Sequence, residues 1–199
     1  MTAGRGAVFL DRDGTINEEV DFLRTPDQLR LIPGAGRAIR ALNDRGILTC
    51  IISNQSGIAR GFLTEEDLIP IHARLVSELG KSGAVIDRIS YCPHHPTEGK
   101  PPYNVRCGCR KPATGMLTDA AKALGIDLTR STVVGDRIVD VQVGQAVGAG
   151  TILVLTGYGT RSVAECRDAG VVPNAVVPSL VEAIGFILEK GSREKSSLS

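Results

Sequence analysis

Short apolar segments alternate with amphipathic segments along the chain. The apolar segments are three to six residues long and rich in β-branched residues, which is typical of strands covered on both faces. The predicted strands are Ala7–Leu10, Ile47–Ile52, Ile86–Tyr91, Thr132–Val134, Thr151–Leu155 and Ala175–Val177. Because a loop and a helical pattern follow each of the first five, the alternation predicts an α/β fold, a Rossmann-like three-layer sandwich with a mostly parallel central sheet.

The amphipathic segments place apolar residues at helical spacing, with capping boxes at Thr64 with Asp67 and at Ser179 with Glu182. The predicted helices are Ala35–Asp44, Glu65–Leu79, Gly115–Leu124, Ile138–Val147, Val163–Ala169 and Leu180–Glu189. A length of 199 residues with 42% hydrophobic and 23% charged residues suits one domain, which we expect to span residues 1–190. The polar residues 191–199 are expected to form a flexible tail.

Charge and composition exclude two classes of partner. The net charge of +1 and the seven aromatic residues, none of them Trp, argue against nucleic-acid binding. No apolar run approaches the roughly 18 residues of a membrane span, and the start of the chain does not resemble a secretory signal. We therefore expect a cytoplasmic protein acting on a small molecule. No helical pattern has an obvious exposed apolar face to spare, so we expect a monomer.

Polar residues follow three of the predicted strands. Asp11-Arg12-Asp13-Gly14-Thr15 comes after the first, Ser53-Asn54 after the second, and Gly135-Asp136, with Asp140 one turn later, after the fourth. Lys111 precedes the helix that leads into the fourth strand. Because ligands bind at the carboxyl ends of parallel strands, these residues predict one site.

Carboxylates gathered at one edge need a cation, and Mg²⁺ binds few carboxylates and pairs with phosphate. Asp11 at the strand tip is placed to attack phosphorus, while Asp13 can protonate the leaving alcohol and later activate water. Ser53 and Lys111 would hold the equatorial oxygens of the transferring phosphoryl group. The sequence thus indicates phosphoryl transfer.

Three of the five cysteines lie close together with two histidines. Cys92 and His94 mirror Cys107 and Cys109 as two pairs spaced by two residues, which predicts a closed, structural zinc site. His95 is the less suitable ligand, because the mirrored spacing selects His94. The alternative is a buried cysteine cluster without metal; Cys50 and Cys166 are interpreted as structural thiols.

The four strand-end motifs together resemble the haloacid-dehalogenase-like phosphohydrolases from about Ala7 to Gly157. The resemblance implies that Asp11 is the nucleophile and Asp13 the acid and base. It also implies that Asp11, Asp136 and the backbone carbonyl of Asp13 hold Mg²⁺. With 39 residues between Asp13 and Ser53, and 57 between Ser53 and Lys111, neither interval has room for a full cap domain.

Within that family, DRDGTIN, SNQSGIARG and CRKP are similar to the heptose bisphosphate phosphatases, whose relatives are the histidinol-phosphate phosphatases. The 12 residues between His94 and Cys107 favour the heptose enzymes, because the relatives have a shorter zinc loop. The implied substrate contacts are Glu19, Val20, Asp21, Phe22, Asn54, Gln55, Ser56, Arg110 and Arg137, together with Ser53 and Lys111. Phe22 and Arg137 depart from the common pattern, which has an aromatic hydroxyl and Lys there.

The resemblance implies removal of the 7-phosphate of a heptose bisphosphate through an aspartyl-phosphate, in the supply of precursors for lipopolysaccharide or S-layer sugars. A histidinol-phosphate phosphatase is the nearest alternative. A zinc-dependent interaction module without catalysis is a third interpretation, which the intact Asp11, Asp13, Lys111 and Asp136 disfavour.

Overall fold

The computed structural model describes residues 4–196, and the side chains up to residue 190. Six strands form one sheet, in which every pairing is parallel. The strands are β1 (Ala7–Leu10), β2 (Leu48–Asn54), β3 (Arg88–Cys92), β4 (Thr132–Gly135), β5 (Gly150–Val154) and β6 (Ala175–Val177). Their order, β3-β2-β1-β4-β5-β6, reverses direction between β1 and β4, and such a switch point opens a crevice at the carboxyl edge of the sheet.

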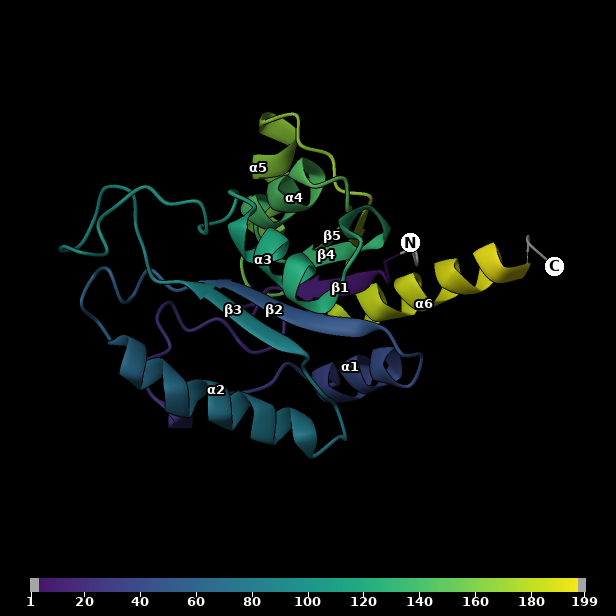
Figure 1. Ribbon diagram of the computed structural model, residues 1–199, viewed down its shortest axis with the longest axis horizontal. Helices are drawn as coiled ribbons and strands as arrows, with labels where there is room; N and C mark the ends of the chain where they lie inside the picture. Colours follow the sequence, from purple (N-terminus) through teal and green to yellow (C-terminus); the bar gives the residue numbers. More distant parts are fainter. Residues whose placement is uncertain (1–3, 197–199) are drawn as a thin grey trace.

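Helices cover both faces of the sheet (Figure 1). They are α1 (Ala35–Asn43), α2 (Glu65–Gly80), α3 (Gly115–Leu124), α4 (Ile138–Ala146), α5 (Gly159–Asp168) and α6 (Leu180–Ser196), with 3-10 turns η1 (Pro26–Gln28) and η2 (Leu128–Arg130). Figure 1 shows α1, α2 and α6 on one face and α3, α4 and α5 on the other. The three-layer α/β sandwich predicted from the sequence is confirmed. No inserted cap domain interrupts the chain within residues 4–196.

Alternate residues of the strands supply the two cores. In β1, Val8 and Leu10 pack toward α1 and α2, whereas Ala7 and Phe9 pack toward α3. The larger core includes Ile39 of α1 and Leu75 of α2, both fully buried. Because both faces are covered, the strands read as continuous apolar runs, which is the pattern that revealed them in the sequence.

Several element boundaries differ from the prediction, most of them by one or two residues; β3, for example, begins at Arg88 rather than at Ile86. Strand β2 continues through Ser53 and Asn54, because these residues pair with Tyr91 and Cys92 of β3. Helix α5 begins at Gly159 rather than at Val163, because its polar first turn starts from a glycine that lies too close to the Val154 carbonyl for any side chain.

Helix α6 continues to Ser196 instead of ending at Glu189. Its last turns contain Lys, Glu and Arg, which favour helices although their polarity suggested a tail. Residues 197–199 of the expected flexible tail lie outside the described residues.

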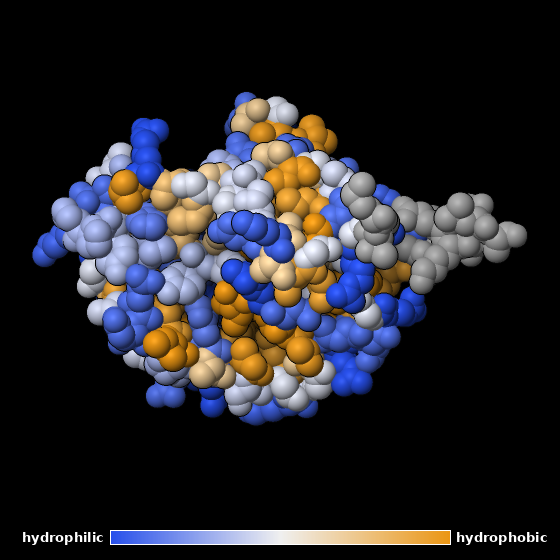
Figure 2. Space-filling model, in the orientation of Figure 1, coloured by the Kyte–Doolittle hydropathy of each residue, from blue (hydrophilic) through white to orange (hydrophobic). Residues whose placement is uncertain are grey.

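Apolar side chains reach the surface in small groups around α2 and the edge strand β3 (Figure 2). They include Ile69 and Val76 on α2 and Val85 ahead of β3. Charged residues lie among them on the same face (Figure 2). None of the helices in residues 4–196 is long and apolar enough to cross a bilayer.

Candidate active site

The switch point between β1 and β4 brings two carboxylates together. Asp11 directly follows β1, Asp136 directly follows β4, and both are buried. Gly14, at φ 76°, turns the chain back beneath Asp136, where a β-carbon would stand 2.2 Å from the Asp136 Oδ2 atom. The Asp-x-Asp-Gly-Thr sequence therefore folds as a tight turn that only glycine permits at this position.

Lys111 enters this site from the loop that precedes α3. Its buried ammonium donates to Asp11 Oδ1 at 2.6 Å, to Asp140 Oδ1 at 2.6 Å and to the Ile52 carbonyl at 2.9 Å, which uses all three of its protons. Burial alone would favour the neutral amine, but the two carboxylates outweigh it and raise the pKa of Lys111 above its usual value. Lys111 is thus a fixed cation at the tip of β1.

Asn54 and Asp140 hold Lys111 in this position. The Asn54 side-chain amide donates to the Lys111 carbonyl and accepts from its backbone N–H, at 3.1 and 3.0 Å. Asp140, in the first turn of α4, accepts the Arg137 N–H with Oδ2 while Oδ1 contacts the ammonium. Both oxygens of Asp140 therefore have protein partners.

The carboxylates gathered around Lys111 fit a divalent cation. Oxygens of Asp11, Asp136 and Asp140 lie within 4.8 Å of one another. Asp136 Oδ2 accepts the Tyr158 N–H, but the buried Asp136 Oδ1 has no partner among the described residues. Burial raises the pKa of Asp11 to about 7 and that of Asp136 to about 8, and the neighbouring carboxylates add to both shifts. A dication between Asp11 and Asp136 would satisfy the unpartnered oxygen and the unbalanced charge.

The Asp13 carboxylate turns away from this group toward Arg12. Arg12 donates through Nε at 3.0 Å and Nη2 at 2.8 Å, while Asn17 Nδ2 and Gln55 Nε2 donate at 2.9 Å each. Burial opposes ionisation, but the Arg12 guanidinium outweighs it and lowers the pKa of Asp13. Gln55 Nε2 also donates to Ser53 Oγ at 2.7 Å. The Asp13 carboxylate and the Ser53 hydroxyl are therefore both bonded to the Gln55 amide.

A cavity of about 570 Å³ opens above these residues. Its lining includes the predicted residues Asp11, Asp13, Glu19, Asp21, Phe22, Ser53, Asn54, Gln55, Ser56, Arg110, Lys111 and Arg137. The guanidinium of Arg137 lies 4.5 Å from the centre of the Tyr158 ring, and Arg110 donates to the His94 carbonyl at 3.0 Å. Burial and the charges of Asp13 and Asp11 raise the pKa of Glu19 to about 7.

The structure does not bring every predicted residue into this cavity. Val20 is 40% exposed and lines a separate hollow beside Pro33, so it is not part of the cavity lining. Arg60, His95 and Tyr158 line the cavity, although neither Arg60 nor Tyr158 was predicted as a site residue. Arg60 stands within the SNQSGIARG motif, which was the one available signal.

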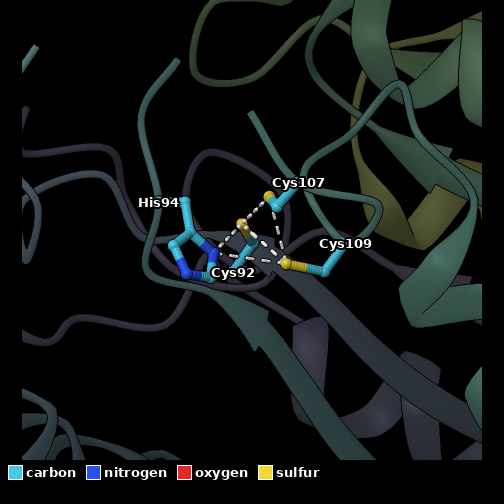
Figure 3. A group of neighbouring side chains, drawn as sticks. All are labelled: Cys92, His94, Cys107 and Cys109. Carbon is cyan, nitrogen blue, oxygen red and sulfur yellow. Dashed lines mark hydrogen bonds between the residues drawn. The ribbon is translucent and has the colours of Figure 1, made fainter. Parts of the chain in front are cut away.

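The predicted zinc ligands converge at one point (Figure 3), and their sequence neighbours His95 and Arg110 line the cavity. The Cys109 sulfur lies 3.1 Å from that of Cys92 and 3.3 Å from that of Cys107, and His94 Nδ1 lies 3.5 Å from Cys92 and Cys109. Three sulfurs and one imidazole nitrogen, all within 4.8 Å, match the donor set and number of a structural zinc site. His95 lies outside this group and accepts the Glu98 N–H.

Comparison with known proteins agrees with this geometry. A family model for HAD-hydrolase-like proteins matches residues 108–183. The chain is 45% identical over 151 residues to D-glycero-beta-D-manno-heptose-1,7-bisphosphate 7-phosphatase of Rhodopseudomonas palustris, which covers 74% of this chain and 84% of the relative. It is 38% identical over 187 residues to the enzyme of the same name from Photorhabdus laumondii, covering 92% of this chain and 99% of the relative.

Among solved structures, the chain is similar to the D,D-heptose 1,7-bisphosphate phosphatase of B. bronchiseptica complexed with magnesium and phosphate. The TM-score is 0.82 at 33% identity, over 93% of this chain and 99% of that one. Fold and site together define a haloacid-dehalogenase-like hydrolase. Within that class, the extent of the matches shows that the chain belongs to the D-glycero-D-manno-heptose-1,7-bisphosphate 7-phosphatase family.

Proposed function

We propose that this protein removes the 7-phosphate of D-glycero-D-manno-heptose 1,7-bisphosphate in a magnesium-dependent reaction. The observation that carries the proposal is the buried group of Asp11, Lys111 and Asp136 at the switch point of the sheet. This buried group occurs in a chain that is 38% to 45% identical to relatives named as heptose-1,7-bisphosphate 7-phosphatases. These relatives favour the heptose bisphosphate over the histidinol-phosphate alternative.

The proposed reaction starts with attack of an Asp11 oxygen on the 7-phosphorus, which releases the sugar alkoxide and forms an aspartyl-phosphate. Asp13, which lines the cavity as a carboxylate paired with Arg12, would have to take up a proton before the reaction; it would then give that proton to the alkoxide and later take one from the water that hydrolyses the intermediate. The positive charge of Lys111, whose three protons are bonded to protein oxygens here, would offset the charge that accumulates on the phosphoryl oxygens, and the hydroxyl of Ser53 would donate to one of them. Bound Mg²⁺, held by Asp11, Asp136 and the Asp13 carbonyl, would neutralise phosphate charge.

We propose that the 1-phosphate, which is not removed, binds on the cationic side of the cavity. Arg110 and Arg137 line the cavity, while Lys111 is already bonded to Asp11 and Asp140. Arg110 is the better placed of the two, because its guanidinium is half-buried and anchored to the His94 carbonyl. Glu19, Asp21 and Phe22 would contact the sugar between the two phosphates.

We also propose that zinc binds Cys92, His94, Cys107 and Cys109 and acts structurally. A four-ligand site leaves no position open for water, so the metal would contribute rigidity rather than chemistry. Cys109 directly precedes Arg110 and Lys111, and Arg110 is bonded to the backbone of His94. Zinc would therefore fix the segment that carries both cations.

The test is phosphate release from the two heptose bisphosphate anomers and from histidinol phosphate, each with and without Mg²⁺. We expect magnesium-dependent turnover of a heptose bisphosphate, with the 1-phosphate retained in the product as seen by ³¹P NMR. Higher catalytic efficiency on histidinol phosphate, or loss of the 1-phosphate instead, would contradict the proposal.

A further inference from the structure

Arg12, between the two motif aspartates, is a fully buried guanidinium with 0% exposure. Its Nε and Nη2 atoms donate to Asp13, and Nη2 also donates to Gln55 Oε1 at 3.0 Å. The position of this guanidinium therefore decides how the Asp13 carboxylate and the Gln55 amide are oriented. Arg12 stands between the active site and the face of the sheet that α2 covers.

The third nitrogen of the guanidinium, Nη1, contacts a side chain from that helix. His72 of α2 places its Nε2 atom 3.3 Å from Arg12 Nη1. An arginine can only donate hydrogen bonds, so His72 Nε2 must be the acceptor. The imidazole is then neutral and carries its proton on Nδ1.

The surroundings of His72 agree with a neutral ring. Burial and the adjacent Arg12 charge lower the pKa of His72 to about 4. The ring also lies against Tyr91 of β3, with centroids 5.7 Å apart, which limits its rotation. The acceptor nitrogen is thus held toward Arg12 by the packing of α2 on the sheet.

We propose that His72 is a positioning residue for Asp13, because the hydrogen bond that it accepts from Arg12 fixes the guanidinium plane that orients the Asp13 carboxylate and Gln55. The contact chain runs from α2 through Arg12 to Asp13, and through Gln55 to Ser53. His72 touches neither substrate nor metal in this role. Without an acceptor at position 72, Nη1 loses this partner and the guanidinium can rotate away from Asp13.

The kinetic part of the test rests on the proposed phosphatase function. His72→Leu should lower kcat about tenfold, a fraction of the 10²- to 10⁴-fold that general acid-base catalysis contributes, and leave KM within about twofold. His72→Gln, whose amide oxygen can accept the same bond, should restore most of kcat. Arg74→Leu, on the exposed side of α2, is the matched control and should behave as wild type.

Each contrary kinetic result overturns the inference. It is wrong if His72→Leu loses thermal stability but keeps its kcat, if only KM changes, or if His72→Gln is as slow as His72→Leu. Should His72→Leu not yield folded protein, His72→Phe fills the space of the ring without an acceptor nitrogen and carries the same expectation.

The tautomer of His72 tests the inference independently of turnover. The chain contains three histidines, so ¹⁵N spectra of the imidazoles can be assigned by substitution. We expect His72 to be neutral with the proton on Nδ1 at pH 7. A proton on Nε2, or a charged ring, would overturn the inference even in a protein that releases no phosphate, whereas inactivity alone counts only against the proposed function.

Discussion

Replacing Asp11 with Asn should abolish catalysis and at the same time stabilise the magnesium-free protein. Asp11 is buried, and its pKa rises from 3.8 to about 7 because of burial and the nearby carboxylates, despite the attraction of Lys111. Keeping it ionised in the folded state therefore costs about 4 kcal/mol relative to the unfolded chain. Asn has nearly the same shape and carries no charge, so this cost disappears.

The gain in folding stability from Asp11→Asn should depend on pH. The folded state binds the Asp11 proton more tightly than the unfolded state, so wild type loses stability as pH rises from about 4 to about 7. The advantage of Asp11→Asn should be small near pH 4 and reach its maximum above pH 7. We expect about 2 kcal/mol at pH 8, half of the full value, because water entering a metal-free site solvates the charges.

The assay is urea denaturation of wild type and Asp11→Asn at pH 5 and pH 8, in buffer prepared without magnesium. No chelator is added, so that zinc is retained. Added Mg²⁺ should stabilise wild type but not the variant, because a cation that binds only the folded state raises its stability. A variant that is no more stable at pH 8, or whose advantage is the same at both pH values, would refute this explanation.

Three other predictions follow from the site. Asp13→Asn should slow turnover by at least about 100-fold with little change in KM, and a mild loss in single-turnover and steady-state rates would contradict its acid-base role. Arg110→Ala should reduce catalytic efficiency more on the bisphosphate than on a sugar monophosphate, by about 10- to 100-fold if a charge-assisted bond is lost; equal losses would exclude it as the distal phosphate contact. Cys107→Ser should lower zinc content and kcat while circular dichroism shows a folded core, and full activity in the zinc-free variant would show that the metal has no functional role.

Patterns confined to a short stretch of sequence predicted most of the fold. The six strands were visible because burial on both faces makes them apolar throughout. The order of motifs at the strand ends likewise predicted that Asp11, Lys111 and Asp136 would meet. Their meeting depends on the parallel topology, which the alternation of elements already implied.

Features that depend on contacts between distant segments could not be predicted. The pairing of Arg12 with His72 joins residues 60 positions apart, and nothing in the helical pattern of α2 distinguishes His72 from a surface residue. The orientation of the Asp13 carboxylate depends on Gln55, 42 residues away, as well as on Arg12 and Asn17 of its own loop. Val20 adjoins residues that line the cavity, yet its side chain belongs to the neighbouring hollow.

The central claim is that Asp11 carries the phosphoryl group during turnover. The most direct measurement is rapid acid quenching of the magnesium-loaded enzyme with heptose 1,7-bisphosphate, followed by mass spectrometry of the peptide that contains Asp11. The account predicts one added phosphoryl group on Asp11 in wild type. The occupancy should be higher in Asp13→Asn if hydrolysis of the intermediate is slowed more than its formation. An unmodified Asp11 in wild type and in Asp13→Asn during active turnover, or a phosphoryl group found on another residue, would contradict it.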